Sequence, residues 1–128
     1  MKVLLDTHLL IWLANDSDRL SARARAVVED ESNDLTFSTA SIWEIAIKSS
    51  LKRAEFILDP RLLRRELLDN GYEELPIASR HAVAILELPR LHGDPFDRLL
   101  VAQAIVEGLV LVTADELVAR YPGPIMKV

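Results

Sequence analysis

The sequence contains no cysteine among its 128 residues, and it has few glycines and few aromatic residues. Without cysteine the chain can form no disulfide, no thiolate zinc site, no iron–sulfur cluster and no thiol nucleophile. Four glycines, six prolines and a hydrophobic fraction of 50% argue against collagenous, low-complexity and disordered classes. Any metal site must therefore use oxygen ligands or the three histidines.

Long hydrophobic runs are missing as well. Only the apolar residues 3–5 separate Lys2 from Asp6, which is too short a stretch for a secretory signal, and no segment approaches the length of a membrane span. Repeats, linkers and low-complexity tracts are also lacking, so we expect residues 1–128 to form a single domain. These absences predict a cytoplasmic protein without a membrane segment.

The sequence has fewer basic residues than acidic ones. Twenty Asp and Glu stand against 15 Lys and Arg, which gives a net charge of −5 at pH 7. This balance argues against simple electrostatic attraction to nucleic acid.

What is present is an alternation of strand and helix patterns. Strands are predicted at residues 3–5, 35–38, 74–78, 109–113 and 124–128. Helices are predicted at residues 7–14, 21–29, 60–71, 79–89, 94–108 and 115–120, and from Thr39 or Ser41 to about Leu51. This order predicts an α/β fold with a parallel sheet flanked by helices on both faces, and ligands bind such sheets beyond the carboxyl ends of the strands.

Two acids follow predicted strands directly. Asp6 comes immediately after the first strand, and Asp115 lies two residues after the strand at 109–113. Parallel strands would bring both carboxylates to the same edge of the sheet. Ordinary helix capping explains either acid alone equally well, so that alternative stays open.

Glu44 lies in a helix that is apolar over most of its circumference. It has two structural interpretations, a capping box with Ser41 and an i,i+4 ion pair with Lys48. Its place at the border of the apolar surface also allows it to face a cleft.

Asp97 gives the sharpest local signal. The helix after Pro95 has its polar stripe at Gln103 and Glu107, whereas Asp97 projects on the apolar side. Asp94 fits the N-cap position, and a supporting role at the edge of a site remains open for it.

Four carboxylates in one cleft would repel one another by about 3 kcal/mol per pair at roughly 5 Å and an effective dielectric near 20. A cation or shared protons must relieve that repulsion. Ligation by oxygen alone selects hard cations, with Mg²⁺ or Mn²⁺ as the matching ions. A metal-activated water would then hydrolyse a phosphodiester bond.

The chain resembles the PIN-domain ribonucleases, specifically the VapC-type toxins of bacterial and archaeal toxin–antitoxin pairs, over essentially its whole length. Four segments carry the resemblance: LLDTHLLIW at 4–12, FSTASIWEIAIK at 37–48, HGDPFDRLLVAQA at 92–104 and LVTAD at 111–115. Each segment alone is modestly specific, whereas their order and spacing together are highly so.

The resemblance implies a PIN-like fold, a small twisted parallel β-sheet with helices on both faces, and a metal-dependent endoribonuclease. It implies catalytic, metal-binding roles for Asp6, Glu44, Asp97 and Asp115, of which Asp115 is the least regular in the family. It further suggests that Thr7, Ser41 or Thr113 orients a ligand or its waters. An RNA substrate, a homodimer and a cognate antitoxin that covers the active site are implied as well.

Several other residues carry weaker signals. Arg98 could pair with a carboxylate or a phosphate, and the segment 48–65, with a local net charge of +3, is a solvated helix face or a phosphate track. We expect surface positions or positions behind the ligands for His8, His81 and His92, and core positions for Trp12 and Trp43. Core packing is also favoured over a contact surface for residues 9–13 and for Leu62, Leu63, Leu67 and Leu68.

Two other functions compete with the nuclease. A haloacid-dehalogenase-like phosphatase would place a second Asp two residues after Asp6, where His8 stands. A non-catalytic PIN-like module that binds RNA or protein is the second alternative, and retention of all four acids argues against it. Without those four acids, 16 acidic residues face 15 basic ones, a net charge of −1 in place of −5, so the acidic excess lies in the proposed site.

Overall fold

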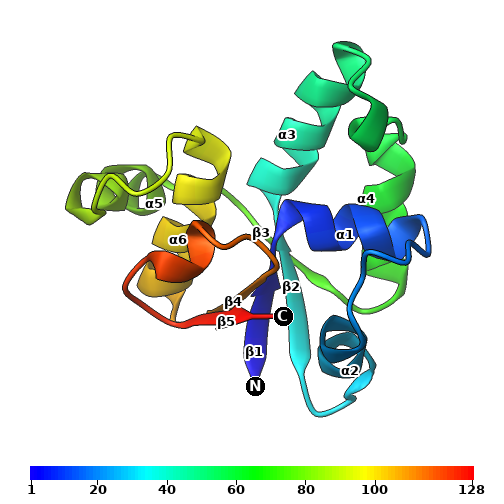
Figure 1. Cartoon of the computed structure of the whole chain (residues 1–128), viewed down its shortest axis with the longest axis horizontal. Helices are drawn as coiled ribbons and strands as arrows, with labels where there is room; N and C mark the ends of the chain where they lie inside the picture. Colours follow the sequence, from blue (N-terminus) through cyan, green and yellow to red (C-terminus); the bar gives the residue numbers. More distant parts are fainter.

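The computed structural model describes all residues, 1–128, and contains one five-stranded sheet in the order β3-β2-β1-β4-β5 (Figure 1). All four strand pairings are parallel, as the alternation of elements predicts. The strands are β1 (Lys2–Leu5), β2 (Asp34–Ser38), β3 (Glu73–Leu75), β4 (Val110–Thr113) and β5 (Ile125–Lys127). The α/β class with a parallel sheet is therefore confirmed.

Capping residues set the helix boundaries. Ser21, Asp59 and Asp94 accept backbone N–H groups at the N-termini of α2, α4 and α6, and Gly108 ends α6 with a φ of 69° that favours glycine. The helices are α1 (Thr7–Ala14), α2 (Ala22–Glu29), α3 (Thr39–Ser50), α4 (Pro60–Asp69), α5 (Ser79–Ala84) and α6 (Pro95–Glu107). Three short 3₁₀ helices are η1 (Ala54–Phe56), η2 (Ile85–Glu87) and η3 (Val118–Arg120).

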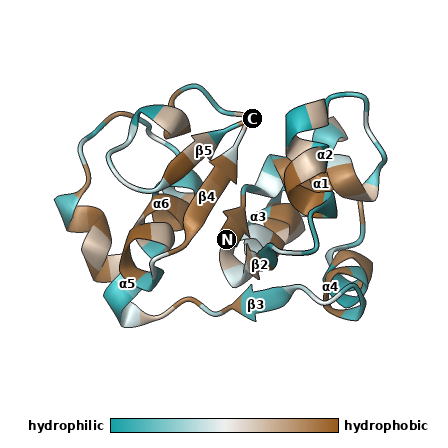
Figure 2. Cartoon of the chain, turned by 90° about the horizontal axis from the view of Figure 1, so that it is seen from below, coloured by the Kyte–Doolittle hydropathy of each residue, from teal (hydrophilic) through white to brown (hydrophobic).

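The sheet separates two hydrophobic cores (Figures 1 and 2). Successive residues of β1 point to opposite faces, so Val3 and Leu5 join the core with α1, α2 and α4, whereas Leu4 joins the core with α6 and η3. All three side chains are fully buried, which explains why β1 is an uninterrupted apolar run. Burial on both faces fixes β1 as the centre of the sheet.

Three elements differ from the prediction. β3 ends at Leu75, since Pro76 has no N–H to donate to a neighbouring strand. The helix predicted at 79–89 divides into α5 and η2. The helix predicted at 115–120 shrinks to η3, because the Asp115 side chain accepts the N–H groups of Leu117 and Val118 and forms a turn instead.

Burial differs from the prediction at two polar and aromatic positions. Trp43 is 53% exposed, so its expected core position is wrong: α3 extends beyond the sheet, as Figure 1 shows, and part of its apolar surface meets solvent. Trp12 is partly buried and packs against the core as expected. Gln103 is fully buried, so the polar stripe of α6 predicted there is wrong.

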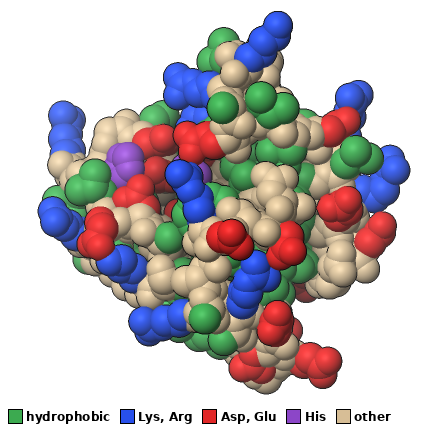
Figure 3. Space-filling view, turned by 45° about the vertical axis from the view of Figure 1, so that its right-hand side comes forward, with side chains coloured by type: hydrophobic (Ala, Val, Ile, Leu, Met, Phe, Trp, Pro, Cys, Tyr) green, Lys and Arg blue, Asp and Glu red, His purple; other side chains and the backbone are tan.

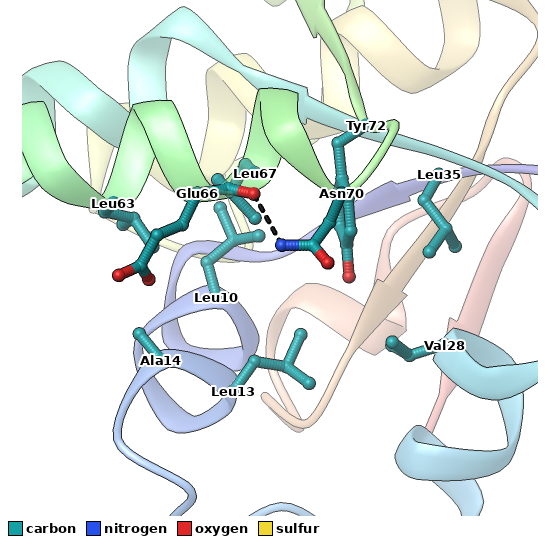
Figure 4. A pocket seen from close by; sticks show the side chains of 10 residues that line it. All are labelled: Leu10, Leu13, Ala14, Val28, Leu35, Leu63, Glu66, Leu67, Asn70 and Tyr72. Atoms are coloured by element: carbon teal, nitrogen blue, oxygen red, sulfur yellow. Dashed lines mark hydrogen bonds between the residues drawn. The ribbon is translucent and has the colours of Figure 1, made fainter.

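The leucine face of α4 is divided between core and surface. Leu63 and Leu67 are buried, whereas Leu62 and Leu68 are exposed. A hollow of about 280 Å³ lies between α1 and α4 and is lined by ten residues, eight of them hydrophobic. Figure 4 shows these side chains, with the Asn70 amide donating to the Glu66 carbonyl oxygen. Separately, none of the helices has both the length and the apolar character needed to cross a bilayer.

Candidate functional site

The parallel pairing of β1 with β4 brings Asp6 and Asp115 to the carboxyl edge of the sheet. Leu5 pairs with Val112, and the next residue along β4, Thr113, donates its hydroxyl to Asp6 Oδ2 at 2.6 Å. The Asp115 backbone N–H donates to the same Thr113 oxygen at 3.0 Å. Thr113 thus connects the two acids.

Asp6 combines two roles that the sequence presented as alternatives. Its Oδ1 accepts the His8 backbone N–H at 3.0 Å and caps α1, and its side chain is almost completely buried. Burial raises the pKa of Asp6, although the hydrogen bonds from Thr113 and His8 act in the opposite direction. Capping therefore fixes the orientation of this side chain at the carboxyl edge of the sheet.

Glu44 points into the site because α3 begins earlier than a capping box with Ser41 would require. Ser38 is the N-cap and accepts the Ala40 N–H, whereas Ser41 shares a 2.8 Å hydrogen bond with Thr7 of α1. The capping-box interpretation of Glu44 is therefore wrong. Its side chain is only 1% exposed.

The ion pair of Glu44 with Lys48 is confirmed. Burial alone would lower the pKa of Lys48, but the neighbouring carboxylates of Glu44, Asp94 and Asp97 raise it above its ordinary value. Glu44 Oε2 accepts from Lys48, while Glu44 Oε1 is buried and has no hydrogen-bond partner. One oxygen of this carboxylate is thus left free inside the protein.

Asp97 lies in the first turn of α6, where Asp94 Oδ1 accepts the N–H groups of Phe96 and Asp97. The capping role of Asp94 holds, and its Oδ2 also lies 3.8 Å from Lys48 Nζ at the edge of the site. Asp97 is 8% exposed, as its place on the apolar side of the helix predicts. Burial and then the charges of Asp6, Asp94, Glu44 and Asp115 raise its pKa to about 8.

His92 lies against the carboxylates. Its Nε2 is 3.1 Å from Asp97 Oδ2 and 3.6 Å from Asp115 Oδ2, and its Nδ1 accepts the Asp94 backbone N–H. Because Nδ1 is an acceptor, a neutral ring carries its proton on Nε2 and donates it toward the acids. The sequence did not assign His92 to the site, because the histidines do not have the spacing of metal ligands. Its position two residues before the capping Asp94 is the sequence feature that indicates a place beside the acids.

The basic residues divide into two groups. Lys48 lies at the site, but Arg61 pairs with Asp59 and Arg64 with Glu74, which removes two cations from the predicted phosphate track. Arg98 does not pair with a carboxylate; its guanidinium reaches only the Ile85 carbonyl oxygen, at 3.4 Å.

A second buried polar cluster lies deeper between α6, β2 and α5. Ser38 Oγ donates to Gln103 Oε1 at 2.5 Å, and the Gln103 amide lies 3.4 Å from His81 Nδ1. His81 is fully buried, so a surface position for it is wrong; its Nδ1 accepts the Ala78 N–H and its Nε2 lies 2.9 Å from Glu107 Oε2. We call Ser38, His81, Gln103 and Glu107 the paired network.

The four acids Asp6, Glu44, Asp97 and Asp115 form what we call the acid cluster; on the face in Figure 3, acidic side chains gather beside histidine side chains. His92, Asp97 and Asp115 each offer a ligand atom within 4.8 Å of the others. A hollow of about 230 Å³ opens in front of Asp6, His8 and Asp115. The unpartnered oxygen of Glu44 and the raised pKa of Asp97 both fit a hard divalent cation, which would bind the oxygens and lower the repulsion.

Known proteins resemble this chain over nearly its full length. "Ribonuclease VapC22" from Mycobacterium tuberculosis is 32% identical over 126 residues, 96% of this chain and 95% of that protein. The crystal structure of VapBC2 from Rickettsia felis, bound to a DNA fragment from its promoter, superposes with a TM-score of 0.71 at 17% identity and covers 99% of this chain and 98% of the other. A toxin-antitoxin complex from Klebsiella pneumoniae superposes with a TM-score of 0.65 at 17% identity, covering 98% and 96%.

The family model of the PIN domain matches residues 3–124. This range covers β1 from Val3 onward, all of β2, β3 and β4, and all four members of the acid cluster. The match thus covers four of the five strands and the carboxyl edge at which the acids lie, and the chain belongs to the PIN domain family.

Proposed function

We propose that this protein is a metal-dependent endoribonuclease that acts as the toxin of a toxin–antitoxin pair. One observation carries the enzymatic part: Asp6, Glu44 and Asp97 are each less than one-tenth exposed, converge at the carboxyl edge of the sheet, and have a single ammonium group, that of Lys48, to balance them. A cluster of this kind is unfavourable without a cation. A purely structural role does not require such a cost.

Asp6, Glu44 and Asp97 are the residues that would hold the ion, with Asp115 at the more exposed side. When bound, a divalent ion lowers the pKa of a coordinated water and neutralises charge on a phosphate oxygen. Thr113 and the His8 N–H hold the Asp6 carboxylate in one orientation, and Lys48 does the same for Glu44. His92 donates toward Asp97 and Asp115 and restricts the orientation of their carboxyl groups.

The choice of RNA as substrate rests on the relative, which is named a ribonuclease and shares 32% of its residues with this chain. The test is cleavage of a mixed RNA pool by the wild type, Asp6→Asn and Asp97→Asn proteins, each with Mg²⁺ or Mn²⁺ and again with EDTA. We expect cleavage only by the wild type with metal. Asp69→Asn, at the exposed end of α4, is the matched control and should cleave like the wild type.

Equal cleavage by Asp6→Asn or Asp97→Asn, or cleavage in EDTA, would refute the metal-nuclease proposal. Absence of cleavage by the wild type together with metal-independent RNA binding would favour the non-catalytic module. Mg²⁺ and Mn²⁺ are distinguished by titrating each ion separately and comparing the concentration at half-maximal rate.

The toxin assignment rests on the fold shared with a toxin-antitoxin complex. Expression of the wild type should arrest growth, Asp97→Asn should not, and co-expression of the product of the adjacent open reading frame should restore growth. Growth arrest by both forms would show that toxicity does not depend on the acid cluster. The homodimer remains a prediction, which light scattering of the purified chain tests.

A further inference from the structure

Arg98 follows Asp97 directly on α6, yet its guanidinium lacks the partner that a partly buried cation normally has. Nη2 lies 3.4 Å from the Ile85 carbonyl oxygen, and Nε is buried without any hydrogen-bond partner. A buried charged donor without an acceptor is unfavourable, because it has lost its hydrogen bonds to water. The protein therefore maintains a guanidinium donor whose acceptor the chain itself does not supply.

Arg98 lines a hollow of about 300 Å³ at the start of α6, together with Arg90, Leu91, His92 and Gly93. Arg90 is exposed, and neither arginine forms an ion pair. The lining holds two permanent positive charges and no acid, although the chain as a whole has a net charge of −5. The chemistry of this lining selects an anion, and a guanidinium fork matches a phosphate particularly well.

The arginine hollow borders the acid cluster. His92 lines the hollow with its ring, while its Nε2 reaches Asp97 Oδ2 at 3.1 Å and Asp115 Oδ2 at 3.6 Å. Asp97 and Arg98 are consecutive on α6, so their side chains diverge by about 100° around the helix axis. His92 thus belongs to the lining of the hollow and also contacts the acid cluster. An RNA strand whose scissile phosphate lies at the acid cluster would therefore carry a neighbouring phosphate past His92 toward the two arginines.

We propose that the arginine hollow is a phosphate subsite in which Arg98 and Arg90 bind a backbone phosphate of the RNA next to the scissile one. This inference rests on the proposed ribonuclease function and adds a residue-level account of substrate binding. Since the proposed contacts are to a backbone phosphate and not to a base, the subsite positions the RNA without selecting a sequence.

The test measures binding of a short, fluorescein-labelled, random-sequence RNA by anisotropy, in an Asp6→Asn background that prevents cleavage. Adding Arg98→Gln or Arg90→Gln should weaken binding by about tenfold for each lost charged contact. The slope of log affinity against log salt should fall by about 0.7. Arg23→Gln, an exposed and unpaired arginine on α2 across the sheet from α6, is the matched control and should bind like the background protein.

Two variants keep the test valid if Arg98→Gln fails to fold. Arg90 lies in an exposed loop, so its substitution leaves the helices intact, and Arg98→Lys keeps the charge but loses the fork. Arg98→Lys should restore the salt slope and only part of the affinity. If Arg90→Gln and Arg98→Gln both bind RNA like Arg23→Gln, the subsite is refuted.

RNA cleavage by the protein with an intact Asp6 distinguishes failure of the subsite proposal from failure of the proposed ribonuclease function. Metal-dependent cleavage combined with unchanged binding by both arginine variants would refute the subsite alone, whereas absence of both cleavage and binding would refute the proposed function as well. A further experiment is an NMR titration with inorganic phosphate, which should shift the ¹⁵N signal of Arg98 Nε in the wild type. A shift with phosphate but no effect of the variants on RNA binding would identify a site for the free anion and overturn the RNA subsite.

Discussion

The acid cluster and the paired network are both polar and mostly buried, and both include residues of α6, but their side chains are satisfied to different degrees. In the paired network every side chain has a partner, from Ser38 through Gln103 and His81 to Glu107. In the acid cluster, Glu44 Oε1 has none, and mutual repulsion helps raise the pKa of Asp97 to about 8.

This difference separates a structural role from a functional one. Buried polar groups that are fully paired add to the uniqueness of a fold, whereas buried charges without partners reduce its stability. Both clusters include residues of α6, Asp97 in the acid cluster and Gln103 and Glu107 in the paired network, so a position on α6 does not by itself explain the contrast. The unsatisfied cluster is the part of the molecule that gains most from binding something else.

The largest expected effect comes from breaking the acid cluster. Glu44→Gln should reduce RNA cleavage by about 100-fold or more, since it removes a charged ligand from the proposed ion. Its stability in EDTA should stay the same or rise, because the substitution relieves repulsion. Cleavage assays and urea denaturation measure the two effects, with Glu73→Gln, at the exposed first residue of β3, as the control. A large loss of stability would assign Glu44 a structural role.

Next in size is the pH dependence of the metal-free protein. The pKa of Asp97 rises from 3.8 to about 8 on folding, so between these pH values the folded chain holds a proton that the unfolded chain has released. The free energy of unfolding should therefore fall as the pH increases from about 4 to 8, and this contribution should level off above that range. Urea denaturation in EDTA at several pH values should show the fall in the wild type and a smaller one in Asp97→Asn. Identical profiles would contradict the raised pKa.

Breaking the paired network should affect stability and leave the acid cluster unchanged. Gln103→Leu removes the acceptor of the Ser38 hydroxyl and should lower the free energy of unfolding by about 1–3 kcal/mol. Affinity for Mn²⁺ should stay within twofold of the wild type. A strong loss of Mn²⁺ affinity at unchanged stability would mean that the two clusters are not separate.

The smallest effect is expected at the exposed rim of the paired network. Arg80 is 60% exposed and donates to Glu107 at 2.9 Å. Arg80→Gln should change the free energy of unfolding by less than about 1 kcal/mol, because solvent screens such pairs. A change as large as that of Gln103→Leu would show that the network depends on its outer charge.

Local chemistry was sufficient to predict most element boundaries. Asp94-Pro95 and Gly108 bound α6, Ser21 begins α2, and the apolar run of β1 marks the central strand, since each depends on residues adjacent in sequence. Parallel order then brings Asp6 and Asp115 to one edge of the sheet. The place of Asp97 on the apolar side of its helix predicted its burial, and the family resemblance assigned the same role to Glu44 and the other three acids.

Tertiary pairing was not predictable in the same way. Gln103 looks like a surface residue on a helical wheel, and its polar atoms are satisfied in the interior only by residues distant in sequence, among them Ser38 and His81. Trp43 looks like a core residue, but α3 extends past the sheet that would cover it. His92 lacks metal-ligand spacing, and its contact with Asp97 depends on how the loop before α6 folds back.

The central claim is that the acid cluster is a cation site, and the most direct test is the melting temperature with and without Mn²⁺ for the wild type and for Asp97→Asn. Binding to the folded state alone stabilises a protein in proportion to the logarithm of ligand concentration. We predict that Mn²⁺ raises the melting temperature of the wild type progressively, and that Asp97→Asn is at least as stable in EDTA but gains little from the ion. Equal stabilisation of both proteins, or none of the wild type, would contradict the claim.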